Sequence, residues 1–134
     1  MRLSQLIYVS RPFGFDAANL DNILVSARRH NARTGITGSL ICRAYLFLQI
    51  LVGPRIAVTE TIGRILRDDR HVEPQILHCG DVAERMFPTW TMRDDPPQSW
   101  MWPQQEVRTG AAADTTAAHA MAIFRRLSRL PRAA

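Results

Sequence analysis

Residues 47–54 read Phe-Leu-Gln-Ile-Leu-Val-Gly-Pro, and this stretch decides the fold. A run of strand-forming residues that ends at a glycine and a proline is typical of a buried β-strand followed by a turn. Gln49 interrupts the apolar run. Because an unpaired buried amide costs on the order of 1–3 kcal/mol, the run predicts a central strand and a polar neighbour for Gln49.

Two further strand candidates lie upstream of this run. Residues 36–42 are separated from residues 45–52 by Arg43 and Ala44 alone, a spacing short enough for a hairpin. Residues 4–10 are also rich in β-forming side chains, and they end where proline and glycine interrupt the chain. We therefore expect residues 4–10, 36–42 and 45–52 to be strands of one sheet.

Two helices alternate with these strands. Asp16 can cap the first helix, which should stop before Gly35, and Pro54 suits the first turn of the second. Both helices show the three-and-four spacing of a single buried face. Their apolar positions are Leu20, Ile23, Leu24 and Ala27 in the first helix and Val58, Ile62, Ile65 and Leu66 in the second.

The rest of the chain predicts two more strands and a tail helix. Residues 74–79 and 86–92 supply the strands, which completes the order β-α-β-β-α-β-β. This order predicts an α+β, ferredoxin-like fold with two helices on one face of a mainly antiparallel sheet. A helix from Asp114 to Leu130 is predicted to cover the other face. Its apolar side contains Ala117, Met121, Phe124 and Leu127.

Length and composition are those of a soluble globular protein, with 134 residues, 46% of them hydrophobic and 22% charged. We expect a core domain in residues 1–95 and a helical extension in residues 96–134. The chain begins with strand-like sequence and contains no apolar run long enough to cross a bilayer, so the expected location is the cytoplasm. Cys42 and Cys79 follow no zinc or redox spacing and are expected to be buried.

The net charge of +5 comes entirely from arginine, because the sequence contains no lysine. Up to residue 95, twelve arginines stand against ten acidic residues, and after it five arginines stand against two. The excess is concentrated in the predicted tail helix. A basic tail helix is usually a solvated face, so this distribution argues against a nucleic-acid partner.

Tyr8, like Gln49, is a polar residue that needs a hydrogen-bond partner, because its hydroxyl lies within the apolar run of residues 6–9. In the predicted topology the first strand neighbours the strand of Gln49, so the two side chains can meet on one face. From spacing alone, a plain hydrogen bond within the core is the favoured explanation of this pair. Asn31 can likewise be a helix cap, and the charges after the second helix can simply be solvated.

Five short motifs occur in order along the chain. Tyr8 lies in Leu-Ile-Tyr-Val-Ser, Asn31 in His-Asn-Ala-Arg-Thr-Gly-Ile-Thr-Gly, and Gln49 in Phe-Leu-Gln, followed by Gly-Pro. Arg-Asp-Asp-Arg-His at residues 67–71 and Phe-Pro-Thr-Trp-Thr-Met at residues 87–92 complete the series. The series resembles the BLUF family, the sensors of blue light using flavin, over about residues 3–93.

The resemblance implies that a flavin, either FAD or FMN, stands with its ring between the two helices and one edge facing the sheet. Tyr8, Gln49 and Asn31 would surround the polar end of the ring. Other side chains would enclose the ring and follow its tail. They are Ile23 and Ile65 as the sandwich, His30 at the border, and Arg64, Asp68 and His71 along the ribityl and phosphate side.

The resemblance also implies a mechanism. Light absorbed by the flavin draws an electron and then a proton from Tyr8, and the Gln49 amide then rotates or changes tautomer. The flavin absorption shifts to the red as its hydrogen bonds change. The strand that carries Trp90 and Met92 would pass the change outward, and either of these two side chains can be the one beside Gln49.

We therefore expect a blue-light photoreceptor and not an enzyme, since nothing in the sequence resembles a catalytic triad or a metal site. The chain has no room for an attached catalytic domain, so its signal would pass in trans to an effector protein. Self-association stays open. The alternative is a small ferredoxin-like enzyme or nucleic-acid-binding module without flavin.

Overall fold

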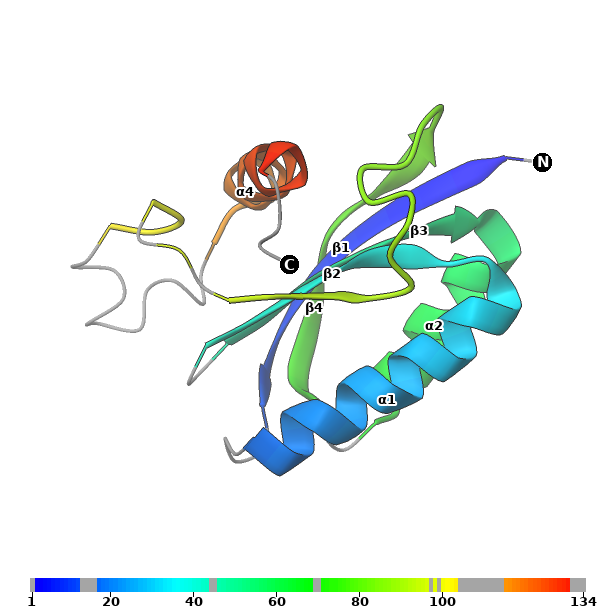
Figure 1. Ribbon diagram of the computed structural model, residues 1–134, viewed down its shortest axis with the longest axis horizontal. Helices are drawn as coiled ribbons and strands as arrows, with labels where there is room; N and C mark the ends of the chain where they lie inside the picture. Colours follow the sequence, from blue (N-terminus) through cyan, green and yellow to red (C-terminus); the bar gives the residue numbers. More distant parts are fainter. Residues whose placement is uncertain are drawn as a thin grey trace.

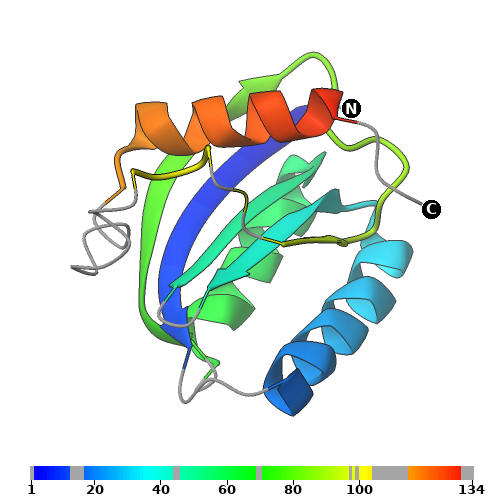
Figure 2. The same ribbon diagram turned by 60° about the vertical axis from the view of Figure 1, so that its left-hand side comes forward.

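The computed structural model describes residues 2–12, 17–43, 46–68, 71–96, 98, 100–103 and 115–130, with the backbone alone at residues 12, 17–19, 43, 71 and 72. A sheet lies between two helices on one side and a third helix on the other (Figure 1, Figure 2). Its strands are β1 (Leu3–Pro12), β2 (Thr37–Arg43), β3 (Leu46–Pro54), β4 (His71–Val82) and β5 (Arg93–Asp95). The helices are α1 (Ala17–Thr34), α2 (Arg55–Leu66) and α4 (Ala117–Arg129).

The strand order is β4-β1-β3-β2-β5, with β1 and β3 in the interior of the sheet. Neighbouring strands are antiparallel except for β5, which runs parallel to β2. Tyr8 of β1 lies directly opposite Gln49 of β3. The predicted ferredoxin-like arrangement is confirmed: α1 and α2 lie on one face of the sheet, and the C-terminal helix lies on the other (Figure 2).

Both faces of the sheet are covered, and β3 shows this most clearly. Residues 46–53 are all buried, because successive side chains of a strand point to opposite faces and each face has its own core. The α1–α2 face holds Tyr8, Phe47 and Leu51 with Ile23 of α1 and Val58 of α2. The α4 face holds Ile7, Leu48 and Ile50 with Ile123, Phe124 and Leu127 of α4.

The end of α1 is set by Gly35, as the sequence predicts. Gly35 has a φ of 75°, a left-handed conformation that side chains disfavour. The amides of Gly35 and Ile36 donate to the carbonyl of Asn31 at 3.0 and 3.2 Å. This glycine cap takes the role that Asn31 could have had, so the Asn31 side chain is available for contacts inside the protein.

The last strand differs from its prediction. Residues 86–92 form turns and bends, and β5 comprises only residues 93–95, whereas β4 is longer than predicted. Pro88 has no amide hydrogen for a sheet ladder. Phe87 and Met92 are nevertheless buried, one in the core of each face. The apolar residues of this segment are therefore buried because the segment crosses from the α4 face of the sheet to the α1–α2 face, and not because it forms a strand.

The helices α2 and α4 differ from their predictions in which residues are buried. Pro54 precedes α2 as its N-cap, and Leu66 is 50% exposed instead of belonging to the buried stripe. In α4 the buried face shifts round to Ala120, Ile123, Phe124 and Leu127, which leaves the predicted Ala117 exposed. Within the part of the chain described, no helix is both long and apolar enough to cross a bilayer.

The start of α4 and one cysteine also correct the predictions. The Thr116 hydroxyl accepts from the His119 amide at 3.1 Å and so caps the helix, a signal that the sequence analysis missed. Cys79 is exposed because β4 is the edge strand. The predicted cap Asp16, the hairpin residue Ala44 and the predicted helix start Asp114 lie outside the described residues.

Candidate functional site

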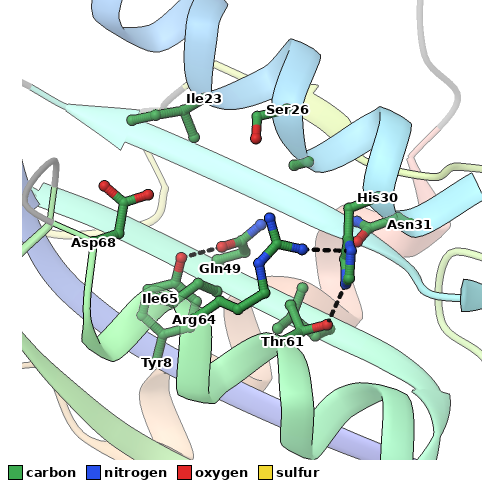
Figure 3. A pocket seen from close by; sticks show the side chains of 12 residues that line it. Tyr8, Ile23, Ser26, His30, Asn31, Gln49, Thr61, Arg64, Ile65 and Asp68 are labelled. Carbon is green, nitrogen blue, oxygen red and sulfur yellow. Dashed lines mark hydrogen bonds between the residues drawn. The ribbon is translucent and has the colours of Figure 1, made fainter.

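A cleft opens between α1 and α2 above the centre of the sheet (Figure 3). Eight of the nine predicted cofactor-site residues line it. The ninth, His71, begins β4, and its side chain lies outside the described residues. The eight are Tyr8, Ile23, His30, Asn31, Gln49, Arg64, Ile65 and Asp68.

A short chain of hydrogen bonds forms the floor of the cleft. The Tyr8 hydroxyl donates to Oε1 of Gln49, and Nε2 of Gln49 donates to the sulfur of Met92 at 3.2 Å. The exposed fractions of the three residues are 0%, 3% and 1%. The amide is thus held by a strong donor on its oxygen side and by a weak sulfur acceptor on its nitrogen side.

Met92, and not Trp90, is the side chain beside Gln49. Trp90 is 38% exposed, and its carbonyl accepts from the amide of Gly38 at 3.0 Å, which fixes the backbone of this segment against β2. A side chain at position 38 would not fit there, because its Cβ would lie 1.9 Å from the carbonyl oxygen of Ile50. Of the two placements that the sequence left open, the structure therefore has the one with the methionine inside.

The Tyr8 hydroxyl keeps its proton. Complete burial raises the pKa of Tyr8 well above its usual range, and the carboxylate of Asp68 raises it further. The phenolate is disfavoured in both ways, since it would lose water and face a negative charge. Tyr8 is therefore a neutral phenol at any physiological pH, and its proton leaves only when an acceptor takes it.

Asn31 ties α1 to the segment that leads into β5. Its side chain is 2% exposed, and its Nδ2 donates to the carbonyl of Thr91 at 2.6 Å. The neighbouring residue Arg28 donates from Nε to the carbonyl of Met92 at 3.0 Å. Asn31 thus lines the cleft and at the same time holds the backbone next to Met92.

A second hydrogen-bonded chain crosses the cleft from α2 to α1 and back (Figure 3). Arg64 donates to Nδ1 of His30, whose Nε2 lies 2.9 Å from the Thr61 hydroxyl. Thr61 in turn donates to the carbonyl of Ala57 at 2.7 Å. Since arginine can only donate, Nδ1 is the acceptor and the proton of a neutral imidazole sits on Nε2.

The surroundings of His30 favour this neutral form. Partial burial lowers the pKa of His30, the positive charges of Arg64 and Arg33 lower it further, and Glu60 opposes them. In a protonated ring Nδ1 would also carry a hydrogen, so it could no longer accept from the Arg64 guanidinium. The bridge between the two helices is therefore built from an uncharged histidine.

The residues present fit a flat heteroaromatic ring. Ile23 from α1 and Ile65 from α2 give the cleft apolar walls, and the buried amides of Gln49 and Asn31 supply polar groups at its floor. Such sites combine apolar surfaces with a few placed polar groups. Arg64, exposed at the mouth, suits an anionic tail. The apolar walls match the faces of a flavin ring, and the amide groups match its carbonyl-rich edge.

Four further lining residues were not named as site residues from the sequence. They include Ser26 and Thr61, which lie four residues before His30 and Ile65 respectively, so each shares a helix face with a predicted site residue. That spacing was sufficient to find them. The full set of unnamed lining residues is Ser26, Ala27, Leu51 and Thr61.

Comparison with known proteins gives consistent matches. The sequence profile of the BLUF family, described as sensors of blue-light using FAD, matches residues 3–93. Photoactivated adenylate cyclase subunit beta of Euglena gracilis is 37% identical over 94 residues, which cover 67% of this chain and 11% of that protein. The chain thus spans about a tenth of the length of this curated relative.

Solved structures agree with the sequence matches. BlrB, a BLUF protein in its dark state, is 29% identical, with a TM-score of 0.78 over 95% of this chain and 96% of that chain. A bacterial light-regulated adenylyl cyclase is 28% identical, with a TM-score of 0.72 over 84% of this chain and 34% of that chain. The ground state of BlsA, at 22% identity and a TM-score of 0.84 over 98% of this chain and 91% of that chain, supports the fold alone. The chain belongs to the BLUF family.

Proposed function

We propose that this chain binds a flavin in the cleft between α1 and α2 and acts as a blue-light photosensor whose signal begins at Gln49. The observation that carries the proposal is the buried chain of Tyr8, Gln49 and Met92 at the floor of the cleft. When bound, the flavin supplies the absorption of blue light and the capacity to accept an electron and a proton.

Tyr8 is the proposed donor. Its phenol is buried and neutral. Its hydroxyl donates to the Gln49 amide, and both side chains line the cleft. Burial disfavours a lone phenolate, so an electron and a proton leave this side chain together at lower cost than a proton alone. Tyr8 therefore supplies both, and it recovers both when the site returns to its dark arrangement.

Gln49 is the proposed switch because its two ends are held unequally. Rotating the amide by half a turn keeps a hydrogen bond with Tyr8, in which Nε2 becomes the donor and the phenol oxygen the acceptor. On the other side the rotation gives up only an N–H···S contact of 3.2 Å with Met92, which is a weak bond. The amide would then present a different group to the cleft, and this would shift the absorption of a bound flavin.

The remaining residues of the site hold the cofactor. Ile23 and Ile65 would enclose the ring from its two faces, Asn31 would bond its polar edge, and His30 would border it. The charged groups would follow the tail of the cofactor, which we propose to be FAD, in line with the family description. These tail-side residues are Arg64, Asp68 and His71.

The signal is proposed to pass to a separate effector protein. The similar proteins include a light-regulated adenylyl cyclase and photoactivated adenylate cyclase subunits, so domains of this kind occur together with catalytic partners. In our proposal, residues 1–95 form the sensor and residues 96–134 form the output segment. The helix of that segment, α4, lies on the opposite face of the sheet from the cleft.

Absorption spectroscopy of the purified full chain tests the proposal. With FAD bound, blue light should shift the flavin band to the red, and the band should return in darkness. Gln49→Leu and Tyr8→Phe should each keep the flavin and abolish the reversible shift. Gln5→Leu is the matched control, because Gln5 is also buried on a central strand and donates to a methionine sulfur, that of Met121, but faces α4.

Three results would contradict the proposal. A chain that takes up neither FAD nor FMN would remove the assigned cofactor. A normal photocycle in Gln49→Leu would remove the assigned switch. A loss of the shift in Gln5→Leu equal to that in Gln49→Leu would also count against it, because the effect would then follow from the loss of any buried glutamine.

A further inference from the structure

The backbone that leads into β5 is anchored at three consecutive carbonyls. Those of Trp90, Thr91 and Met92 accept from the Gly38 amide, the Asn31 side chain and the Arg28 side chain, at 3.0, 2.6 and 3.0 Å. Two of these three donors belong to α1, and Asn31 lines the cleft. The start of β5 is therefore mechanically tied to the cleft wall as well as to Gln49.

Neighbouring residues at this point face opposite sides of the sheet. Met92 belongs to the core of the α1–α2 face, where its sulfur meets Gln49. Arg93 is 5% exposed and lies on the other face, with its guanidinium 4.9 Å from the ring centre of Phe87. Only one peptide unit thus separates the side chain beside Gln49 from a buried cation on the α4 side.

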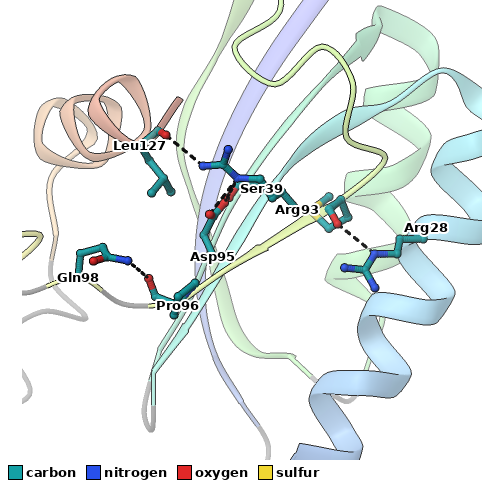
Figure 4. Close-up of polar contacts among 8 residues, drawn as sticks. Arg28, Ser39, Arg93, Asp95, Pro96, Gln98 and Leu127 are labelled. Atoms are coloured by element: carbon teal, nitrogen blue, oxygen red, sulfur yellow. Dashed lines mark hydrogen bonds and ion pairs between the residues drawn. The ribbon is translucent and has the colours of Figure 1, made fainter. Parts of the chain in front are cut away.

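The Arg93 guanidinium is held in a fixed polar cluster (Figure 4). Its Nε lies 2.9 and 2.7 Å from the two carboxylate oxygens of Asp95, and Ser39 donates its hydroxyl to the same carboxylate. Asp95 and Ser39 are also buried, with exposed fractions of 4% and 0%. A charge pair taken out of water in this way needs every partner, so the guanidinium has one favoured position.

The free end of that guanidinium reaches α4. Its Nη2 donates to the carbonyl of Leu127 at 3.0 Å. Leu127 lies in the last turn of α4, where a cation is stabilising, and its carbonyl also accepts from the amide of the C-cap residue Leu130 at 3.2 Å. In Figure 4 the arginine spans the space between β5 and the helix end. β5 therefore supplies a second, charged donor to the C-terminal end of α4.

We propose that Arg93 couples the cleft to α4, as a positioning residue that caps the helix in the dark and releases it when the Gln49–Met92 contact changes. This inference rests on the proposed function. A shift of Met92 moves β5, the guanidinium follows Asp95, and its bond to the Leu127 carbonyl is lost. The last turn of α4, which carries the exposed Arg126 and Arg129, then loosens and becomes the part that an effector detects.

Hydrogen exchange of the flavin-bound full chain, measured in darkness and under blue light, tests the coupling. In the unsubstituted protein, illumination should speed exchange of the amides of residues 127–130. In Arg93→Met the red shift should be unchanged, dark exchange at these amides should already be fast, and the light-minus-dark difference should be lost. A simple loss of stability would not abolish the difference while leaving the red shift intact.

Two further variants keep the test decisive. Arg93→Met combined with Asp95→Asn avoids an unpaired buried carboxylate, so it should fold even where the single variant does not. It should also lack the light-minus-dark difference. Arg126→Met is the matched control, since it removes an exposed arginine of the same helix that stacks on Trp100 and has no bond to β5. It should retain the difference.

The outcomes separate this inference from the function on which it rests. A normal red shift with an undiminished light-minus-dark difference in both Arg93 variants would overturn the coupling and leave the photosensor intact. The coupling is equally refuted by a normal red shift in the unsubstituted protein without any change at residues 127–130. Absence of flavin or of a red shift in the unsubstituted protein would overturn the proposed function, and the coupling with it.

Discussion

Gln49 and Gln5 are two buried glutamines on neighbouring strands, each of which donates from its amide nitrogen to a methionine sulfur. The distances are 3.2 Å from Gln49 to Met92 and 3.6 Å from Gln5 to Met121. Gln49 also accepts from Tyr8 and lines a cleft, whereas Gln5 faces the core beneath α4. In our proposal, the same local pair thus serves packing on one face and signalling on the other. What differs is the second partner and the space that the face leaves for a ligand.

The largest expected effect tests how fully each face is packed. Phe124→Ala on the α4 face should lower the free energy of unfolding by about 3–5 kcal/mol, because Phe124 is fully buried against Phe87 and leaves a cavity. Ile23→Ala, in the wall of the cleft, should cost only about 2 kcal/mol, since part of its surface already faces open space. Urea denaturation without flavin measures both. Equal losses would mean that the two faces are packed alike.

A smaller effect is expected from the two methionines. Met92→Leu conserves volume but removes the acceptor that holds the Gln49 amide, a contact worth roughly 0.5–1 kcal/mol. The arrangement to which the site returns is then less stable, so recovery of the flavin band in darkness should slow about two- to five-fold. Met121→Leu removes the equivalent contact on the other face and should leave recovery unchanged. Equal rates in the two variants would show that the sulfur contact does not bias the amide.

The smallest expected effect concerns pH and the bridge across the cleft. The pKa of His30 is lowered by burial and by Arg64, so as pH falls below about 6.5 the unfolded chain binds a proton that the folded chain does not. Stability should therefore decrease between neutral and mildly acidic pH, and less so in His30→Gln. Urea denaturation of both proteins at about pH 7.5 and 5.5 measures the difference. An identical pH dependence would argue against a neutral His30 in the folded state.

Much of the fold could be predicted because local sequence and tertiary packing agree. The run that contains Gln49 is central, the helix faces around Ile23 and Val58 are buried, and Gly35 ends α1. β5 could not be predicted, since three residues carry no periodicity and the strand exists only through parallel pairing with β2. The shift of the buried face of α4 likewise depends on how the helix meets the sheet.

The site was predictable to a different extent. The topology indicated that Tyr8 and Gln49 share a face, and the register places them directly opposite each other. The choice between Met92 and Trp90 was beyond the sequence, because both are large apolar residues separated by one position. It depends on the path of residues 83–92, which three backbone carbonyls fix against β2 and α1. Arg93 escaped notice because its contact with the Leu127 carbonyl joins residues that are distant in sequence.

The burial of β3 on both faces has a consequence for the newly made chain. Without Gln49, residues 46–52 would be an unbroken apolar segment of high strand propensity, which is the kind of sequence that aggregates before it folds. We expect a single amide in its middle to reduce this tendency. The residue proposed as the switch should thus also limit aggregation, and Gln49→Leu should give a lower soluble yield than Gln5→Leu.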